Sequence, residues 1–378
     1  MTDTPALPAA LVGDPARLFR VKIVEDSVPD PGLGWGHPKR LVSYWLTYPR
    51  VLLVELNTHR MFSRSTESSR AIPPAARRRQ LEACPYRPLR WGAKVKGMGA
   101  GADLEERAAL TASAGWEHAL RSALYAGAMM SEAGAAKEEL NRVSEPFALC
   151  RTVVSSSVWD NFFALRAHEA AHPAFQFLAK AMYVARLDST PQVLKSGEWH
   201  LPFIGPGDPE ALLKYVAETR PAGCPDHPLP GHRRRGVFSW VAHHLCRWSA
   251  ARCARVSYGL LDGRPATPAA DDETWAKLVG RPGEGSLAAW ELPGKIGPGA
   301  WPYRPVHASP MEHQGTPGLP TSTADGECDP YSGNLPGWVQ FRKLLGGECV
   351  RFFDPPSAEV AAWRDAIPPE VFGDADLY

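Results

Sequence analysis

Alternating apolar and polar residues predict two strands near the beginning of the chain. Leu18 to Ser27 follows this pattern, in which every second side chain faces the same side of a sheet, and Leu41 to Thr47 is expected to be the second strand. Pro49 suits the first turn of a short helix reaching Leu56, because the N–H that proline lacks is not needed there. A further short strand is expected over Thr152–Ser156.

Helical spacing dominates the middle of the sequence. Trp116, Leu120 and Leu124 recur at i, i+4 and i+8, which predicts the core-facing stripe of a helix. Asp103 with Glu106 is typical of a capped helix start, and Gly134 is typical of a helix end. Further helices are expected over Ala136 to about Val143, over Trp159–Arg166, from Pro173 with Leu178, Met182 and Ala185 on one side, and over Val237–Ser257. The fold class predicted is therefore mixed α+β, a small mixed or antiparallel sheet packed with long helices.

Proline and glycine, with 37 and 33 residues, are frequent enough to predict loop-rich insertions. Residues 1–17 are rich in Pro and Ala, so we expect a flexible N-terminal arm. The remainder, 18–378, is expected to form one domain. Within it, 205–236 is expected to be a linker or lid between the parts 18–204 and 237–378.

Composition argues against several classes of function. A formal net charge of +1 gives no support for binding a nucleic acid polymer, so any anion site must be local. Seven scattered cysteines without a CxxC pair do not resemble a secreted disulfide framework. His243, His244, Cys246 and Cys253 match no familiar zinc spacing, so no metal site is expected. With no secretion signal and no run of about 18 apolar residues, we expect a cytoplasmic protein that does not bind membranes.

The stretch Asn57–Arg70 concentrates polar chemistry directly after the apolar run Val51–Leu56. It contains His59, Arg60, Arg64 and Arg70 among hydroxyl groups at Ser63, Ser65, Thr66, Ser68 and Ser69. Guanidinium groups beside hydroxyl and backbone N–H groups suit an oxyanion such as phosphate. The alternative is a solvated basic loop, and a solvated surface is also the expectation for Arg77–Arg79.

The order of residues in this stretch resembles a known signature. HRxxSxxxxSxR is similar to the signature of flavin-dependent thymidylate synthases (the ThyX type), and it is carried here by His59, Arg60, Ser63, Ser68 and Arg70. Thr58 departs from the arginine that opens the family's pattern, and Ser65-Thr66 departs from its Asn-Glu. The nucleotide-phosphate part of the signature is therefore matched better than the flavin part.

Four other segments resemble the same family, namely Lys137–Pro146, Asn161–Arg166, Arg252–Tyr258 and His307–His313. The last two precede the signature in the family, whereas here they follow it. The resemblance therefore implies a single ThyX-like catalytic domain whose segments are circularly permuted, which is possible because chain ends are often close together at a protein surface.

The resemblance also implies roles for individual residues. Arg70 and Arg142 would grip a nucleotide phosphate with the help of Ser68, and Glu55 would contact the sugar or base. Arg166 would be catalytic, placed against the uracil O4/N3 edge to favour the ionised ring. Surface ion pairs are the alternative for the arginines, and a solvated carboxylate is the alternative for Glu55. Cofactor-binding residues by resemblance are His59, Arg60, Ser63, Asn161, His307, Ser309 and Glu312.

The reaction implied is reductive methylation of dUMP to dTMP, with FAD as cofactor and NADPH and 5,10-methylenetetrahydrofolate as co-substrates, in a homotetramer whose chains share each site. Cys84, Cys150 and Cys224 stand in no recognisable nucleophile context, which argues against a thiol-dependent mechanism. Two alternatives remain open. One is a related pyrimidine nucleotide modification, such as hydroxymethylation of dUMP or dCMP, and the other is a nucleotide-binding relative without enzymatic activity.

Overall fold

The computed structural model describes residues 11–29, 40–96, 99, 101–194, 200–219, 236–257, 267–279 and 356–373. The predicted cofactor contacts His307, Ser309 and Glu312 lie outside these residues, as does Cys224.

A five-stranded sheet in the order β3-β4-β2-β1-β5 forms the centre of the fold. Its strands are β1 (Arg20–Pro29), β2 (Leu41–Pro49), β3 (Ser63–Thr66), β4 (Leu149–Ser156) and β5 (Gln192–Leu194). All pairs are antiparallel except β1 with β5, which is parallel. The predicted strands near the N-terminus are confirmed, and so is the mixed α+β class.

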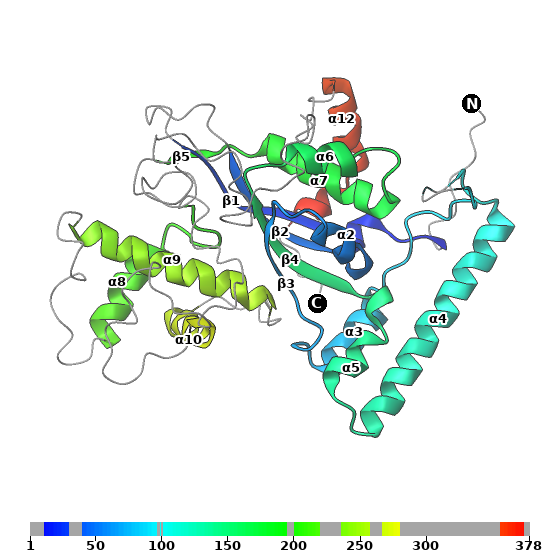
Figure 1. Cartoon of the computed structure of the whole chain (residues 1–378), viewed down its shortest axis with the longest axis horizontal. Helices are drawn as coiled ribbons and strands as arrows, with labels where there is room; N and C mark the ends of the chain where they lie inside the picture. Colours follow the sequence, from blue (N-terminus) through cyan, green and yellow to red (C-terminus); the bar gives the residue numbers. More distant parts are fainter. Residues whose placement is uncertain are drawn as a thin grey trace, which may run out of the picture.

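Helices surround this sheet (Figure 1). They are α1 (Pro15–Leu18), α2 (Leu53–Asn57), α3 (Pro74–Ala83), α4 (Glu106–Glu132), α5 (Lys137–Arg142), α6 (Asp160–Arg166), α7 (Pro173–Asp188), α8 (Asp208–Thr219), α9 (Gly236–Ser257), α10 (Pro268–Val279) and α12 (Ser357–Ala366), with 3-10 turns η3 (Arg50–Leu52), η4 (Glu145–Phe147) and η7 (Pro369–Phe372). None of the helices in the described ranges is long and apolar enough to cross a membrane.

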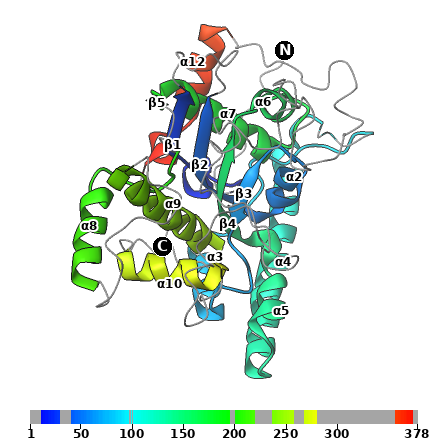
Figure 2. The same cartoon turned by 60° about the vertical axis from the view of Figure 1, so that its left-hand side comes forward.

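The two faces of the sheet are covered by different helices, because side chains alternate along each strand. One face packs on α6, α7 and α12, where the hydroxyl of Tyr44 donates to the carbonyl of Met182 at 3.0 Å. On the other face, Cys253 and Val256 of α9 pack on Val153 of β4. Figure 2 shows α9 lying across this second face, with α8 and α10 beyond it.

The long helix α4 confirms the stripe predicted from spacing. Leu120 is buried, and Trp116 and Leu124 pack against the same apolar cluster. Gly134 has a φ of +76°, a left-handed conformation that suits glycine, directly after the helix end. The predicted capped start is wrong, because Asp103 instead binds Arg90 at 2.7 Å and no side chain caps the first turn.

Residues 11–17, which we expected to belong to a flexible arm, are held against the domain. The backbone N–H of Gly13 donates to Pro88 at 2.9 Å, and the carbonyl of Leu11 accepts from the indole of Trp91 at 2.8 Å. A Cβ at position 13 would lie 2.3 Å from a backbone oxygen, so this close approach requires glycine.

Helix α8 (Asp208–Thr219) lies within the segment 205–236 that we expected to be a linker or lid. Its Leu212 packs with Leu245 and Trp248 of α9 in a separate apolar cluster. The described part of this segment is therefore a packed helix of a three-helix unit formed by α8, α9 and α10 (Figure 2).

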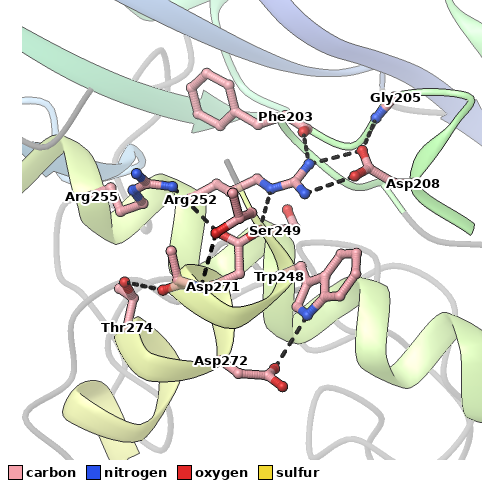
Figure 3. Close-up of polar contacts among 12 residues, drawn as sticks. Phe203, Gly205, Asp208, Trp248, Ser249, Arg252, Arg255, Asp271, Asp272 and Thr274 are labelled. Carbon is pink, nitrogen blue, oxygen red and sulfur yellow. Dashed lines mark hydrogen bonds and ion pairs between the residues drawn. The ribbon is translucent and has the colours of Figure 1, made fainter. Parts of the chain in front are cut away.

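Arg252 joins the three helices through a buried charge cluster (Figure 3). Its guanidinium binds both carboxylate oxygens of Asp208 at 2.7 and 2.8 Å, and its Nε donates to Asp271 at 2.8 Å. Burial raises the pKa of Asp271 above its ordinary value, although Arg252 opposes the shift. Arg252 also donates to the carbonyl of Phe203, a residue held at a φ of +64°. Such a conformation is costly without glycine, so this bond stabilises a strained connection between sheet and helices.

Arg252→Met is expected to lower the free energy of unfolding by about 3 kcal/mol or more, because it removes the cation that binds the buried carboxylate of Asp271 and the partly buried carboxylate of Asp208. Chemical denaturation measures the change. Lys214→Met is the matched control, since Lys214 and Glu218 form an exposed pair at 3.9 Å, and it is expected to change the free energy by less than about 0.5 kcal/mol. Equal losses in both variants would contradict the role assigned to Arg252.

Candidate functional site

The stretch Asn57–Arg70 is divided by strand β3 rather than forming one loop. Ser63 lies opposite Ser155 of β4, and Thr66 lies opposite Thr152. The eight residues of β4 span roughly 25 Å at about 3.3 Å per residue. Helix α5 lies before the first end of β4 and α6 follows the other, and Figures 1 and 2 show these helices at opposite ends of the sheet.

At the α6 end, four residues form what we call the Arg166 cluster: Glu55, Thr58, His59 and Arg166. The Nη1 of Arg166 donates to Oε2 of Glu55 at 2.7 Å, and its Nε donates to Nε2 of His59 at 3.0 Å. A longer bond of 3.4 Å reaches the hydroxyl of Thr58. Nε2 of His59 is the acceptor of its bond with Arg166, because a guanidinium can only donate.

The surroundings of Arg166 explain why its charge needs a partner. Phe162 and Phe163 anchor α6 in the core, and the guanidinium lies 4.9 Å from the ring centroid of Phe175. The side chain of Arg166 is 21% exposed and that of Glu55 is 36% exposed. The pair is thus partly desolvated but open to solvent on one side, where a ligand can approach it.

At the α5 end, residues Ser68–Ala71 form what we call the Arg70 turn. The N–H of Ala71 donates to the carbonyl of Ser68 at 2.9 Å, which closes the turn. The side chain of Arg70 is 63% exposed, and its one partner within the described part of the chain is Glu138 of α5 at 3.8 Å. Arg142 follows Glu138 by one helical turn and therefore lies on the same side of α5.

Asn141 and Glu145, which the sequence analysis did not single out, hold the Arg70 turn in place by hydrogen bonds. The amide of Asn141 donates to the carbonyl groups of Ser69 and Ile72 at 2.7 and 2.9 Å. The hydroxyl of Ser69 donates to Glu145, whose carboxylate lies 3.0 Å from Nε of Arg50. Short polar side chains that bind nearby backbone groups give no periodic signal, so pattern alone could not identify them.

The structure groups the predicted residues in two sets. Glu55, His59 and Arg166 meet in the Arg166 cluster. Arg60 follows His59 in the sequence, and Asn161 lies in the first turn of α6, the helix that carries Arg166. Ser68 and Arg70 lie in the Arg70 turn, and Arg142 lies on α5 one helical turn after Glu138, the partner of Arg70. Ser63, at the start of β3, is partly buried. A single chain therefore does not bring Arg166 together with Arg70 and Arg142.

Two further arginines of the sequence analysis have structural partners. Arg64 donates to the side chain of Asn57 at 2.7 Å and to the carbonyl of His59 at 3.0 Å, so it braces the stretch internally. The expectation that Arg77 is solvated is wrong, because it is buried and donates to the carbonyl of Leu149 at 3.2 Å.

The described thiols are unsuited to nucleophilic attack. Burial raises the pKa of Cys150 to about 12, and burial likewise raises the pKa of Cys84 and Cys253. Few thiolates would form at neutral pH in such surroundings. Among the described residues, no group of three or more His, Cys, Asp or Glu side chains could hold a metal ion.

No family model matches the sequence, and no curated protein matches it either. Among solved structures, the chain is similar to a UMP/dUMP methylase, PolB from Streptomyces cacaoi bound with 5-Br UMP, at 16% identity over 46% of this chain and 89% of that chain, with a TM-score of 0.38. It is also similar to the flavin-dependent thymidylate synthase ThyX from Helicobacter pylori complexed with FAD and dUMP, at 21% identity over 39% of this chain and 67% of that chain, with a TM-score of 0.26. Because these TM-scores are below 0.5, the assignment of fold rests on the strands and helices of this chain alone.

Arg166→Lys is expected to lower the free energy of unfolding by about 1–2 kcal/mol, because one ammonium group cannot reproduce the fork that binds three partners. Denaturation midpoints measure the loss. Arg78→Lys is the control, since Arg78 forms an exposed pair with Glu82 at 2.8 Å, and it is expected to have an effect within about 0.5 kcal/mol. A similar effect in both variants would show that the Arg166 cluster does not stabilise the fold.

Proposed function

We propose that the protein is an FAD-dependent thymidylate synthase that methylates dUMP reductively, with 5,10-methylenetetrahydrofolate and NADPH as co-substrates. The observation that carries the proposal is the placement of the signature. Its His59 joins Arg166 of α6 in one accessible guanidinium site and its Arg70 lies in a second, so the signature does not form one solvated loop. The resemblance of the sequence signature assigns a nucleotide base to the first site and a phosphate to the second.

The Arg70 turn suits a phosphate group. Arg70 and Arg142 present charged N–H donors, and Arg142 makes no hydrogen bond or ion pair to another described residue. The exposed pair between Arg70 and Glu138 is weak, so a dianionic phosphate can displace the carboxylate at little cost. Ser68 is partly exposed at the first position of the turn and adds a hydroxyl donor.

The Arg166 cluster suits the edge of a pyrimidine ring. A guanidinium has five N–H groups, and Arg166 directs three bonds to Glu55, Thr58 and His59. Two N–H donors therefore remain for the O4/N3 edge of uracil. A donor beside this edge stabilises negative charge there and makes C5 more nucleophilic. Glu55 opposes that charge, so its carboxylate must accept a hydrogen bond from the substrate or stay on Arg166.

The residues around the Arg166 cluster fit the polar groups of FAD. Arg60 is exposed and binds no other described side chain, and Asn161 likewise has no described partner. A guanidinium can bind a diphosphate and an amide can bind the flavin ring, with His59 and Ser63 nearby. When bound, reduced FAD would supply the hydride. Arg60 and Asn161 would hold and orient the cofactor, and no described thiol would take part.

Separation of the two guanidinium sites supports an assembly of several chains. Arg166 lies beyond one end of β4, whereas Arg142 precedes the other end, roughly 25 Å away at about 3.3 Å per residue. One nucleotide cannot span this distance. We therefore propose a homo-oligomer, a tetramer by resemblance, in which Arg166 of one chain faces Arg70 and Arg142 of another.

A second candidate, modification of a cytosine nucleotide, is favoured by Glu55. Its carboxylate lies 2.7 Å from Arg166, and a carboxylate accepts well from the amino group of cytosine. A carboxylate and a guanidinium side by side match the N4 donor and N3 acceptor of that ring. Hydroxymethylation of dCMP would then use the same phosphate site.

The purified protein is expected to show the visible absorbance of an oxidised flavin, or to acquire it with added FAD. With dUMP, methylenetetrahydrofolate and NADPH it is expected to release dTMP, which mass spectrometry detects. A product heavier by one oxygen identifies hydroxymethylation instead, and dCMP as the consumed substrate identifies the second candidate. Nucleotide binding with no flavin and no product would contradict both enzymatic functions.

A further inference from the structure

The amide of Asn141 holds the Arg70 turn on both sides of Arg70. Asn141 is fully buried on α5, and its Nδ2 donates to the carbonyl of Ser69 at 2.7 Å and to that of Ile72 at 2.9 Å. These two carbonyls flank Arg70 and Ala71 in the chain. Together with the bond that closes the turn, they fix the backbone from which the Arg70 side chain extends.

Folding stability alone does not account for asparagine at this position. Its Oδ1 is buried and has no hydrogen-bond partner in the described part of the chain. A buried acceptor without a partner destabilises a fold, and asparagine is also a weak helix former. Leu140, the residue before it, already supplies the apolar contact of α5. The distinctive contribution of Asn141 is therefore the pair of hydrogen bonds that it donates to the turn.

We propose that Asn141 is a positioning residue that sets Arg70 and Arg142 at the spacing required by the phosphate of a nucleoside monophosphate. The inference rests on the proposed function. Asn141 itself does not touch the ligand. Because Arg142 is its neighbour on α5 and Arg70 lies in the turn that it binds, one side chain fixes the backbone positions from which both guanidinium groups extend.

Preorganisation explains why such a residue matters for affinity. The Arg70 side chain is mostly exposed and has one weak partner, so its own contacts do not hold it. Ordering a flexible backbone and side chain at the moment of binding costs affinity. If the backbone of the turn is already fixed before binding, only the Arg70 side chain loses conformational entropy when the ligand binds.

Titration calorimetry on the full chain tests the proposal with two ligands, dUMP and deoxyuridine, which differ by the phosphate. Asn141→Ala is expected to weaken dUMP binding about tenfold, because the released turn must then be ordered when the phosphate binds, and to leave deoxyuridine binding unchanged. Asn141→Ser retains one short donor, so its loss of dUMP affinity is expected to be smaller than that of Asn141→Ala. It replaces the alanine variant in the test if that variant does not fold. In the Asn141→Ala background, Arg70→Gln is expected to cause little further loss.

Leu140→Ala is the matched control, because it removes a buried contact of the same helix without touching the turn. It is expected to leave the ratio of the two dissociation constants unchanged. If Asn141→Ala weakens both ligands equally, or Leu140→Ala changes the ratio as much, the positioning role is overturned. If neither ligand binds the unaltered protein, the proposed function itself fails.

Discussion

The antiparallel pairing of β3 with β4 constrains the candidate binding residues in the described part of the chain. Once Ser63 lies opposite Ser155, the chain before β3 must reach α6 and the chain after it must reach α5. His59 then meets Arg166, whereas Arg70 meets Glu138. A stretch of fourteen residues thus supplies two sites at opposite ends of one sheet, and this separation leads to the proposal that chains cooperate in binding one nucleotide.

Local partners decide what each arginine can do. Arg166 shares its charge with Glu55 and keeps spare donors, so it suits a neutral or weakly charged ring edge. Arg70 has only an exposed carboxylate at 3.8 Å, so it suits a doubly charged phosphate. Arg252 is buried between Asp208 and Asp271, and its ion pairs stabilise the packing of α8, α9 and α10. Its helix α9, which carries residues 252–257 of the segment Arg252–Tyr258, packs against β4 and β3.

Much of the fold could be predicted because its helices repeat their apolar residues at helical spacing. The stripe of α4 is one case, and Leu178 with Met182 on the buried side of α7 is another. Strand β3 could not be predicted, because Ser63–Thr66 has no apolar alternation and is a strand only through pairing with β4. Burial of Arg77 was equally hidden, since it depends on a carbonyl 72 residues away in the chain. Motif spacing indicated Glu55, His59 and Arg166, but the turn-binding role of Asn141 depends on tertiary contacts alone.

Complementation between two inactive variants tests most directly whether chains share each site. Arg70→Ala and Arg166→Ala are each expected to abolish turnover of dUMP, because each removes one guanidinium from every site. When differently tagged chains carrying the two changes are co-expressed and purified through both tags, some sites combine an intact Arg70 with an intact Arg166. The account predicts that activity returns in these mixed assemblies. Mixed assemblies that form but remain inactive would contradict it.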